Sequence, residues 1–465
     1  MKADMAGRKL LAIAAAPLAA LLIGACGGGH SSSAASSATT TPSSTDIPQP
    51  PLGHLNKLTR SRLAPGNQRV DLTMPTFSNP TQITNPLFPI SKLESVVILG
   101  EVSGAPLKVE TTLLPETKTV VWNGQRIKCR QSQFLAYLRG RITESAIDLY
   151  AQADDGSVWY FGEDVVDYAK GLAATSAGTW RVGENGYPGA MIMPGHPKVG
   201  DVYRTENIPG VAWEQVTVKK TGITVNGPIG PIRSAMLGQE LHMDETALEP
   251  KIFAPGHGEF FSGRPHDFEA NALAVPADAT SGSLPAELNR LLNGAYDVVG
   301  AAGAKDWTSA SASLASMTRA WDAYRAGQVP PRLAAELRAA LDALATTVRT
   351  RSQRRASQAA LDVANATLDL QLRYRPPAEI NLARFELWAW QLAVDAKARN
   401  PGAVHGDVTT LGFIRDRIAI NSADGNWIDD QLRYLRAVAE AHEFKVAVQQ
   451  AALLQRKLEG VRPRA

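Results

Sequence analysis

A chain of 465 residues is longer than a single small hydrophobic core supports, so its length predicts at least two domains. Its composition, 44% hydrophobic and 20% charged, is typical of a soluble globular protein, and no stretch reaches the roughly 18 apolar residues of a spanning helix. A net charge of +3 over the whole chain is too weak for a nucleic-acid-binding surface, so no nucleic-acid partner is expected.

The N-terminus has the pattern of a secretory signal peptide. Three basic residues precede an apolar run over 10–22 that is too short to cross a bilayer. The segment LIGAC, which ends at Cys26, resembles the lipobox of bacterial lipoproteins. This resemblance implies that residues 1–25 are removed and that Cys26 carries a diacylglyceryl group, enough for stable membrane anchoring. The alternative is an ordinary signal cleaved nearby, with Cys26 incidental.

The lipobox also predicts location and redox state. The mature protein is expected to be exported and lipid-anchored to the outer face of the cell membrane, or to lie in the outer membrane or periplasm of a Gram-negative cell. With Cys26 lipidated, Cys129 has no disulfide partner and is interpreted as a small buried hydrophobic residue. Residues 26–80 are predicted to be a lipid-anchored disordered linker and lead-in, because Gly, Ser, Thr, Ala and Pro dominate 27–51.

Residues 81–270 have the pattern of a β-rich domain. Short runs rich in Val, Ile, Thr and aromatic residues alternate with Gly, Pro, Asn and Asp. The dipeptide Asn123-Gly124 between two such runs is a strong signal for a type I′ hairpin turn. The many closely spaced strands predict an antiparallel curled sheet, sandwich or partial barrel.

A second hairpin is predicted around the dipeptide Asp155-Gly156. With a two-residue loop, the register places Tyr150 opposite Phe161 and Asp148 opposite Glu163 on one sheet face, whereas a three-residue loop would shift it. Like charges directly opposite each other are unfavourable. Something should therefore offset the two facing carboxylates.

The facing carboxylates allow three interpretations. Asp148 and Glu163 could be the acid pair of a glycosidase-like hydrolase, since such enzymes need two positioned carboxyl groups. They could hold a divalent cation together with Asp164, since hard cations take oxygen ligands. The third interpretation is a structural hairpin whose acids are solvated or paired with an arginine such as Arg181 or Arg204.

The residues of this hairpin belong to a longer pattern: YAQ at 150–152, VWYFGE at 158–163, IMP at 192–194, VGDVYRTE at 199–206 and KIFAPGHG at 251–258. The pattern resembles an uncharacterised family of exported bacterial proteins, over about residues 111–261. The resemblance implies an exported β domain and supplies no activity or catalytic residue. The chain departs from the pattern at Ala153 and His257.

A second cluster combines histidines with acids. It contains His242, His257 and His266 among Asp244, Glu245, Glu249, Glu259, Asp267 and Glu269. Imidazole and carboxylate groups suit zinc, iron or copper. No pair has the His-Glu-x-x-His spacing that places two ligands on one helical face, so a metal site would have to assemble across loops. Scattered surface residues are the alternative.

The last part of the chain changes to a helical pattern. Residues 271–285, rich in Ala, Ser and Pro, are predicted to be a linker. From 286 to 460, apolar residues recur at spacings of three and four, with prolines at the breaks. This predicts an antiparallel helical bundle, and hence an α+β chain with the β-rich part first.

No phosphate loop, nucleotide fingerprint, nucleophile elbow or zinc-finger spacing is present, so no cofactor is predicted. The sequence favours a non-enzymatic, membrane-anchored lipoprotein that binds a small molecule or an envelope protein. Two alternatives remain open. One is an envelope-directed hydrolase that uses Asp148 and Glu163, and the other is a metal-handling protein that uses the cluster between His242 and Glu269.

Overall fold

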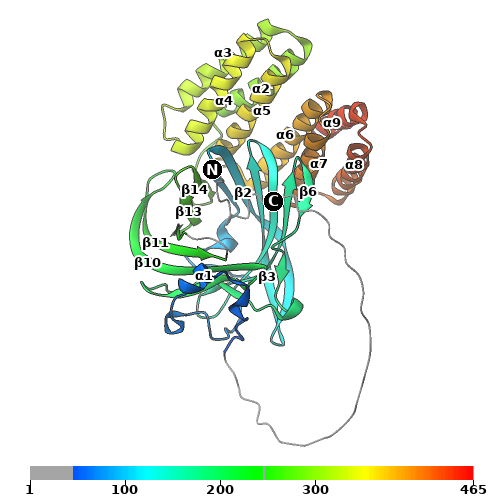
Figure 1. Ribbon diagram of the computed structural model, residues 1–465. Helices are drawn as coiled ribbons and strands as arrows, with labels where there is room; N and C mark the ends of the chain where they lie inside the picture. Colours follow the sequence, from blue (N-terminus) through cyan, green and yellow to red (C-terminus); the bar gives the residue numbers. More distant parts are fainter. Residues whose placement is uncertain (1–45, 244–246, 464–465) are drawn as a thin grey trace, which may run out of the picture.

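A computed structural model describes residues 46–243 and 247–463 of the chain (Figure 1). The predicted signal peptide, Cys26 and residues 26–45 of the predicted linker lie outside the described residues. The described chain begins with short helical turns, continues as an antiparallel sheet and ends in helices. This order confirms the predicted α+β class. None of the described helices is both long and apolar enough to span a bilayer.

The strands pair in one curled sheet, in the order β6-β5-β4-β3-β2-β1-β14-β13-β12-β11-β10-β9. Their bounds are β1 (Ser95–Val102), β2 (Ala105–Trp122), β3 (Gln125–Leu138), β4 (Arg141–Gln152), β5 (Val158–Ala169), β6 (Leu172–Thr175), β7 (Trp180–Arg181), β8 (Ala190–Met193), β9 (Val202–Ile208), β10 (Ala212–Asn226), β11 (Pro231–His242), β12 (Glu249–Ala254), β13 (Gly258–Arg264) and β14 (Asp267–Val275).

The two halves of the sheet meet at the long-range pair β1–β14, and all other neighbours along the order are sequential hairpins. At the far ends, β8 pairs with β5 and then leads into β9, so the sheet curls round without closing into a barrel. Figure 1 shows β10 and β11 curving on one side, with β2 and β3 on the other. The sheet therefore surrounds an interior, as the predicted partial barrel would.

The turns explain why neighbouring strands pair in these registers. Asn123 and Gly124 both have positive φ, 46° and 79°, and Trp122 pairs with Gln125, which confirms the predicted type I′ turn. At the second hairpin, the backbone N–H of Ala153 donates to the carbonyl of Ser157 at 2.8 Å. The loop is therefore one residue longer than the two-residue loop on which the predicted register was based.

The longer loop shifts the register near the tip of the β4–β5 hairpin, and a bulge then reverses the shift. Tyr150 pairs with Tyr160, so the predicted pairing of Tyr150 with Phe161 is wrong. The irregularity beyond this pair restores the predicted register, and Asp148 lies opposite Glu163 as predicted. Gly162 adopts φ 136° within the irregularity, and a Cβ there would lie 2.5 Å from the carbonyl oxygen of Trp180.

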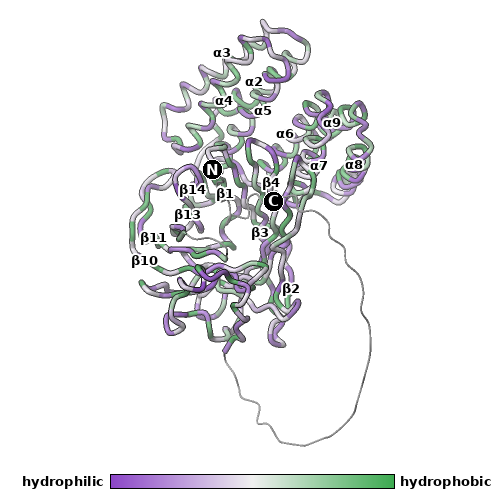
Figure 2. Tube along the Cα trace, in the orientation of Figure 1, coloured by the Kyte–Doolittle hydropathy of each residue, from purple (hydrophilic) through white to green (hydrophobic). Residues whose placement is uncertain are grey.

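The helical part follows β14 with little connecting chain. Its helices are α2 (Ala286–Ala304), α3 (Trp307–Tyr324), α4 (Pro331–Arg349), α5 (Gln353–Gln371), α6 (Pro377–Lys397), α7 (Pro401–Asp416), α8 (Ser422–Glu440) and α9 (Phe444–Leu458). Hydrophobic and hydrophilic residues alternate along these helices (Figure 2), as amphipathic packing requires. Because β14 extends to Val275 and pairs with β1, the first five residues of the predicted linker are strand.

Two groups of helices pack against the sheet. Helices α2–α5 share a hydrophobic core with Val97 of β1 and Leu273 of β14. Helices α6–α9 share a second core with Leu135 and Tyr137 of β3, where Tyr137 stacks on Trp388 at a centroid distance of 5.4 Å. The helices thus cover the sheet directly, and a third core lies within the β part.

Buried charges join the same two parts. Glu110 of β2 accepts a hydrogen bond from Arg417 at 2.7 Å and lies 3.4 Å from Arg384. Lys108, on the same strand, contacts Asp369 of α5 at 2.6 Å. These groups are almost fully shielded from solvent, and burial of unpaired charges is strongly unfavourable. The network therefore joins the helices to the sheet, and we expect the two parts to unfold together.

The lead-in before the sheet is packed as well. Residues 46–80, which belong to the predicted disordered linker and lead-in, contain α1 (Lys57–Ser61). Leu55 is buried against Trp213 of β10 and Leu241 of β11. This segment therefore covers part of the curled sheet.

Candidate functional site

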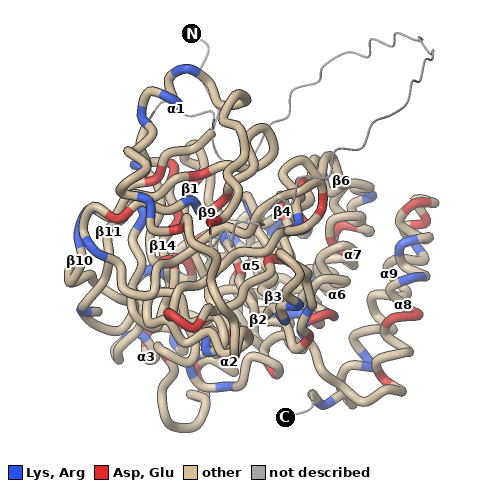
Figure 3. The backbone as a smooth tube through the Cα atoms, turned by 90° about the horizontal axis from the view of Figure 1, so that it is seen from below, with Lys and Arg blue, Asp and Glu red and all other residues tan. Residues whose placement is uncertain are grey.

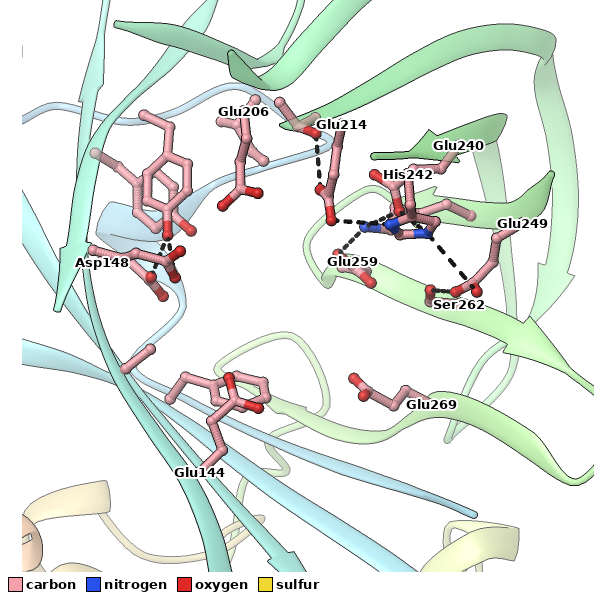
Figure 4. Close-up of a pocket in the computed structure, with 18 residues that line it drawn as sticks. Glu144, Asp148, Glu206, Glu214, Glu240, His242, Glu249, Glu259, Ser262 and Glu269 are labelled. Atoms are coloured by element: carbon pink, nitrogen blue, oxygen red, sulfur yellow. Dashed lines mark hydrogen bonds and ion pairs between the residues drawn. The ribbon is translucent and has the colours of Figure 1, made fainter. Parts of the chain in front are cut away.

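The interior of the curled sheet holds a cavity of about 230 Å³. Figure 4 shows side chains from β4 on one side and from β9 to β14 on the other pointing into a shared space. The acidic residues that line it are Glu144, Asp148, Glu163, Glu206, Glu214, Glu240, Glu249, Glu259 and Glu269. Among the described lining residues, only Lys251 and His242 are basic. Elsewhere, charges of both signs are dispersed along the backbone (Figure 3).

Strand geometry explains how so many acids reach one space. Residues two apart on a strand point to the same face, so Glu144 and Asp148 of β4 share a face, as do Glu240 and His242 of β11. Direct pairing across strands then forms rows. Glu206, Glu214 and His242 lie side by side on β9, β10 and β11, and Glu249 lies opposite Glu240.

Tyr160 holds the predicted acid pair. Its hydroxyl lies 2.6 Å from Asp148 Oδ1 and 3.1 Å from Glu163 Oε2, while its ring stacks on Tyr150 at 4.8 Å. Burial, followed by the charges of Asp148 and Glu163, raises the pKa of Tyr160 well above its ordinary value. The hydroxyl therefore stays protonated and donates to the carboxylates. With one proton, it cannot donate a full hydrogen bond to both acids at once.

The arginines named as candidate partners of this acid pair bind elsewhere. Arg181 forms an ion pair with Asp164. The guanidinium of Arg204 donates to Asn207 at 2.7 Å and lies over the ring of Trp213 at 5.3 Å. The prediction missed Tyr160 as the group that bridges the acids, because the assumed register placed it on the opposite face.

On the other side of the cavity, His242 lies among three carboxylates. Its Nδ1 is 3.1 Å from Glu214 Oε1, and its Nε2 is 3.6 Å from Glu240 Oε2 and 4.0 Å from Glu249 Oε2. Burial lowers the pKa of His242, but the hydrogen bond with Glu214 and the charges of Glu240 and Glu214 outweigh this effect and raise the pKa to about 9. The ring is therefore an imidazolium at neutral pH.

The buried carboxylate of Glu240 is close to two basic groups. Lys251 Nζ lies 2.8 Å from Glu240 Oε2 and 3.5 Å from Glu259 Oε2. Burial and the charge of Glu214 raise the pKa of Glu240 to about 7, while Lys251 and His242 oppose the shift. Burial beside other acids therefore makes Glu240 a weaker acid than a free glutamate, even with two basic neighbours.

The predicted histidine cluster does not converge. His257 binds the carbonyl of Pro255 and the carboxylate of Asp278, away from the cavity. His266 lies exposed in the turn before β14, 3.5 Å from Glu101. The three histidines therefore do not form one site, because His257 and His266 lie in turns outside the row of inward-facing side chains.

The acids of the predicted cluster between His242 and Glu269 also lie partly inside and partly outside the cavity. Glu249, Glu259 and Glu269 line the cavity, Asp267 begins β14 outside the lining, and Asp244 and Glu245 lie outside the described residues. The cavity also contains acids that the sequence analysis did not name: Glu144, Glu206, Glu214 and Glu240. Their alternate spacing on strands was a usable signal, but only the curled sheet shows that the strands face one interior.

Several of these side chains could hold a metal ion. One ligand atom from each of Glu214, Glu240 and His242 lies within 4.8 Å of the others, the kind of spacing that a bound ion draws together. Comparisons of the chain with family models, curated proteins and solved structures returned no match. The resemblance to exported bacterial proteins therefore stays a prediction.

Proposed function

We propose that this protein is a membrane-anchored extracytoplasmic binding protein that takes a small cationic ligand into its acid-lined cavity. The anchor is the predicted lipid on Cys26. The observation that carries the proposal is the lining itself, with nine acidic side chains against one lysine and one histidine. Carboxylates gathered in one cavity repel one another, and a cation bound among them reduces this repulsion.

The cavity volume limits the ligand to a small one. About 230 Å³ lies below the roughly 300–1,000 Å³ that pockets for drug-sized molecules occupy. A metal ion or a short ammonium compound fits such a space. This supports a binding role over the alternative of an envelope-directed hydrolase, although Asp148 and Glu163 both line the cavity.

The acid pair is bound to a single hydroxyl group. In glycosidases the two carboxyl groups lie on opposite sides of the bond to be cleaved. Here Asp148 and Glu163 are direct cross-strand neighbours and bind the same hydroxyl of Tyr160. Their arrangement suits a shared proton or a cation between them better than a substrate bond.

Calorimetric titration of the purified protein tests the proposal. We expect binding of at least one cation from a panel of Zn²⁺, Ca²⁺, ethylammonium and ethylenediammonium, and none of acetate, a small anion used as control. Glu206→Gln, within the cavity, should weaken binding at least tenfold. Glu116→Gln, the same substitution at an exposed acid of β2, should leave it unchanged. Absence of binding to every cation, or turnover of a glycan, ester or peptide substrate, would contradict the proposal.

A further inference from the structure

We infer that the preferred ligand is a divalent transition-metal ion of the Zn²⁺ type, bound by His242 Nε2 together with the carboxylates of Glu240 and Glu249. This inference rests on the proposed function and names its ligand class. It assigns a site that combines one imidazole nitrogen with carboxylate oxygens, a donor set that suits zinc and its neighbours.

The backbone fixes these three side chains on one face of two paired strands. His242 follows Glu240 by two residues on β11, so both point into the cavity. Glu249 of β12 is the direct cross-strand partner of Glu240. Because the sheet holds all three positions, a metal would need only small side-chain movements rather than assembly across loops.

The distances agree with shared coordination. His242 Nε2 lies 3.6 Å from Glu240 Oε2 and 4.0 Å from Glu249 Oε2. These separations are too long for hydrogen bonds. The separation between His242 and Glu240 is close to the spacing of about 3.4 Å between neighbouring ligand atoms around a tetrahedral zinc ion, and Glu249 would have to move closer to complete the set. Among the described residues, the ligand atoms that all lie within 4.8 Å of one another come from Glu214, Glu240 and His242.

One atom of each of two proposed ligands lacks a hydrogen-bond partner. His242 Nε2 and Glu240 Oε1 are buried without one, whereas Glu240 Oε2 forms an ion pair with Lys251 at 2.8 Å. The Glu240 side chain is only 1% exposed. Buried polar atoms are normally hydrogen-bonded, so these two atoms at the cavity wall indicate that a ligand binds there.

Neighbouring groups already hold the proposed ligands in orientation. His242 Nδ1 lies 3.1 Å from Glu214 Oε1, a contact that fixes the ring and leaves Nε2 on the side of Glu240 and Glu249. The hydroxyl of Ser262 donates to Glu249 Oε1 at 2.6 Å. Carboxylate–histidine–metal arrangements of this kind are the usual support of zinc ligands. In the absence of metal, the ammonium of Lys251 is the cation closest to Glu240.

The test is calorimetry on the full-length protein after chelator treatment, with Zn²⁺ at pH 7. We expect one ion per chain, because the cavity wall offers one set of ligands. His242→Gln should weaken binding at least 100-fold. Glu214→Gln should weaken it about 10- to 100-fold, as loss of an orienting group does.

Two controls separate this site from the rest of the cavity and from folding. Asp148→Asn, on the opposite wall, should change Zn²⁺ affinity less than threefold, and His266→Gln should change nothing. Circular dichroism checks that each variant folds; if His242→Gln does not, Glu249→Gln replaces it and should also lose at least 100-fold.

The outcomes distinguish the inference from the proposed function. Zn²⁺ binding that survives His242→Gln but is lost in Asp148→Asn would overturn the inference and leave cation binding in place. Binding of ammonium compounds but not of Zn²⁺ would also overturn the inference and leave cation binding in place. Absence of binding to any cation would overturn both.

Discussion

The charge of His242 predicts a measurable pH dependence of stability in the metal-free protein. Hydrogen bonding with Glu214 and the charges of Glu240 and Glu214 outweigh burial and raise the pKa of His242 from 6.5 to about 9. Lys251 acts in the opposite direction. Glu249, 4.0 Å from Nε2, also faces the ring. The folded protein therefore binds a proton that the unfolded chain releases near pH 6.5.

The sign and size of the effect follow from this difference in pKa. A group whose pKa is raised by folding stabilises the fold fully below its unfolded pKa, and the contribution disappears as pH rises through the folded pKa. At about 1.4 kcal/mol per pH unit, the interval from 6.5 to about 9 corresponds to about 3 kcal/mol. The protonated ring of His242 should therefore contribute this amount at pH 6 and almost none at pH 10.

Urea unfolding in the presence of a chelator, at pH values from 6 to 10, measures the effect. The free energy of unfolding of the wild type should fall by about 3 kcal/mol more than that of His242→Gln across this range. His266→Gln, the same substitution at an exposed histidine, should follow the wild type. Parallel curves for the wild type and His242→Gln would refute the reasoning, because the ring would then carry no extra proton in the folded state.

Three further predictions concern other parts of the molecule. Tyr160→Phe removes the donor between the two acids of β4 and β5 and should destabilise the protein by about 1–3 kcal/mol in chemical unfolding at pH 7; an unchanged midpoint would exclude that role. Glu110→Gln leaves buried Arg417 and Arg384 without their shared carboxylate and should lower the free energy of unfolding by about 3–5 kcal/mol. In chemical unfolding, the sheet and the helices should be lost in one transition, and two separate transitions would contradict their unfolding together. Cys26→Ser should abolish fatty-acid labelling and release the protein from the membrane fraction, and retention there would count against the predicted anchor.

Local patterns in the sequence predicted local structure well. The alternation of residue types predicted strands, the spacing of apolar residues predicted helices, and Asn123-Gly124 predicted its turn because two-residue hairpins need positive φ at both positions. The pairing of Asp148 with Glu163 was predicted for a similar reason. That success depended on two deviations that cancel, a longer loop and an irregularity at Gly162.

The cavity could not be predicted in the same way, because its walls come from distant parts of the chain. Glu144 and Glu206 share one interior only because β1 pairs with β14 and the sheet curls round. Sequence proximity instead suggested that His257 and His266 accompany His242, although the two lie in turns. A prediction based on inward-facing strand positions would have found Glu240 beside His242, two residues apart.

Anomalous diffraction from crystals grown with Zn²⁺ tests the central claim of cation binding in the cavity most directly. One strong anomalous peak should appear in data collected above the zinc absorption edge and almost vanish in data collected below it. The peak should lie about 2.0–2.2 Å from His242 Nε2, with oxygens of Glu240 and Glu249 at similar distances. A peak near Asp148 and Glu163 would show that the ion binds at the opposite wall of the cavity. A cavity without any peak, in crystals that bind zinc only at the protein surface, would contradict the account.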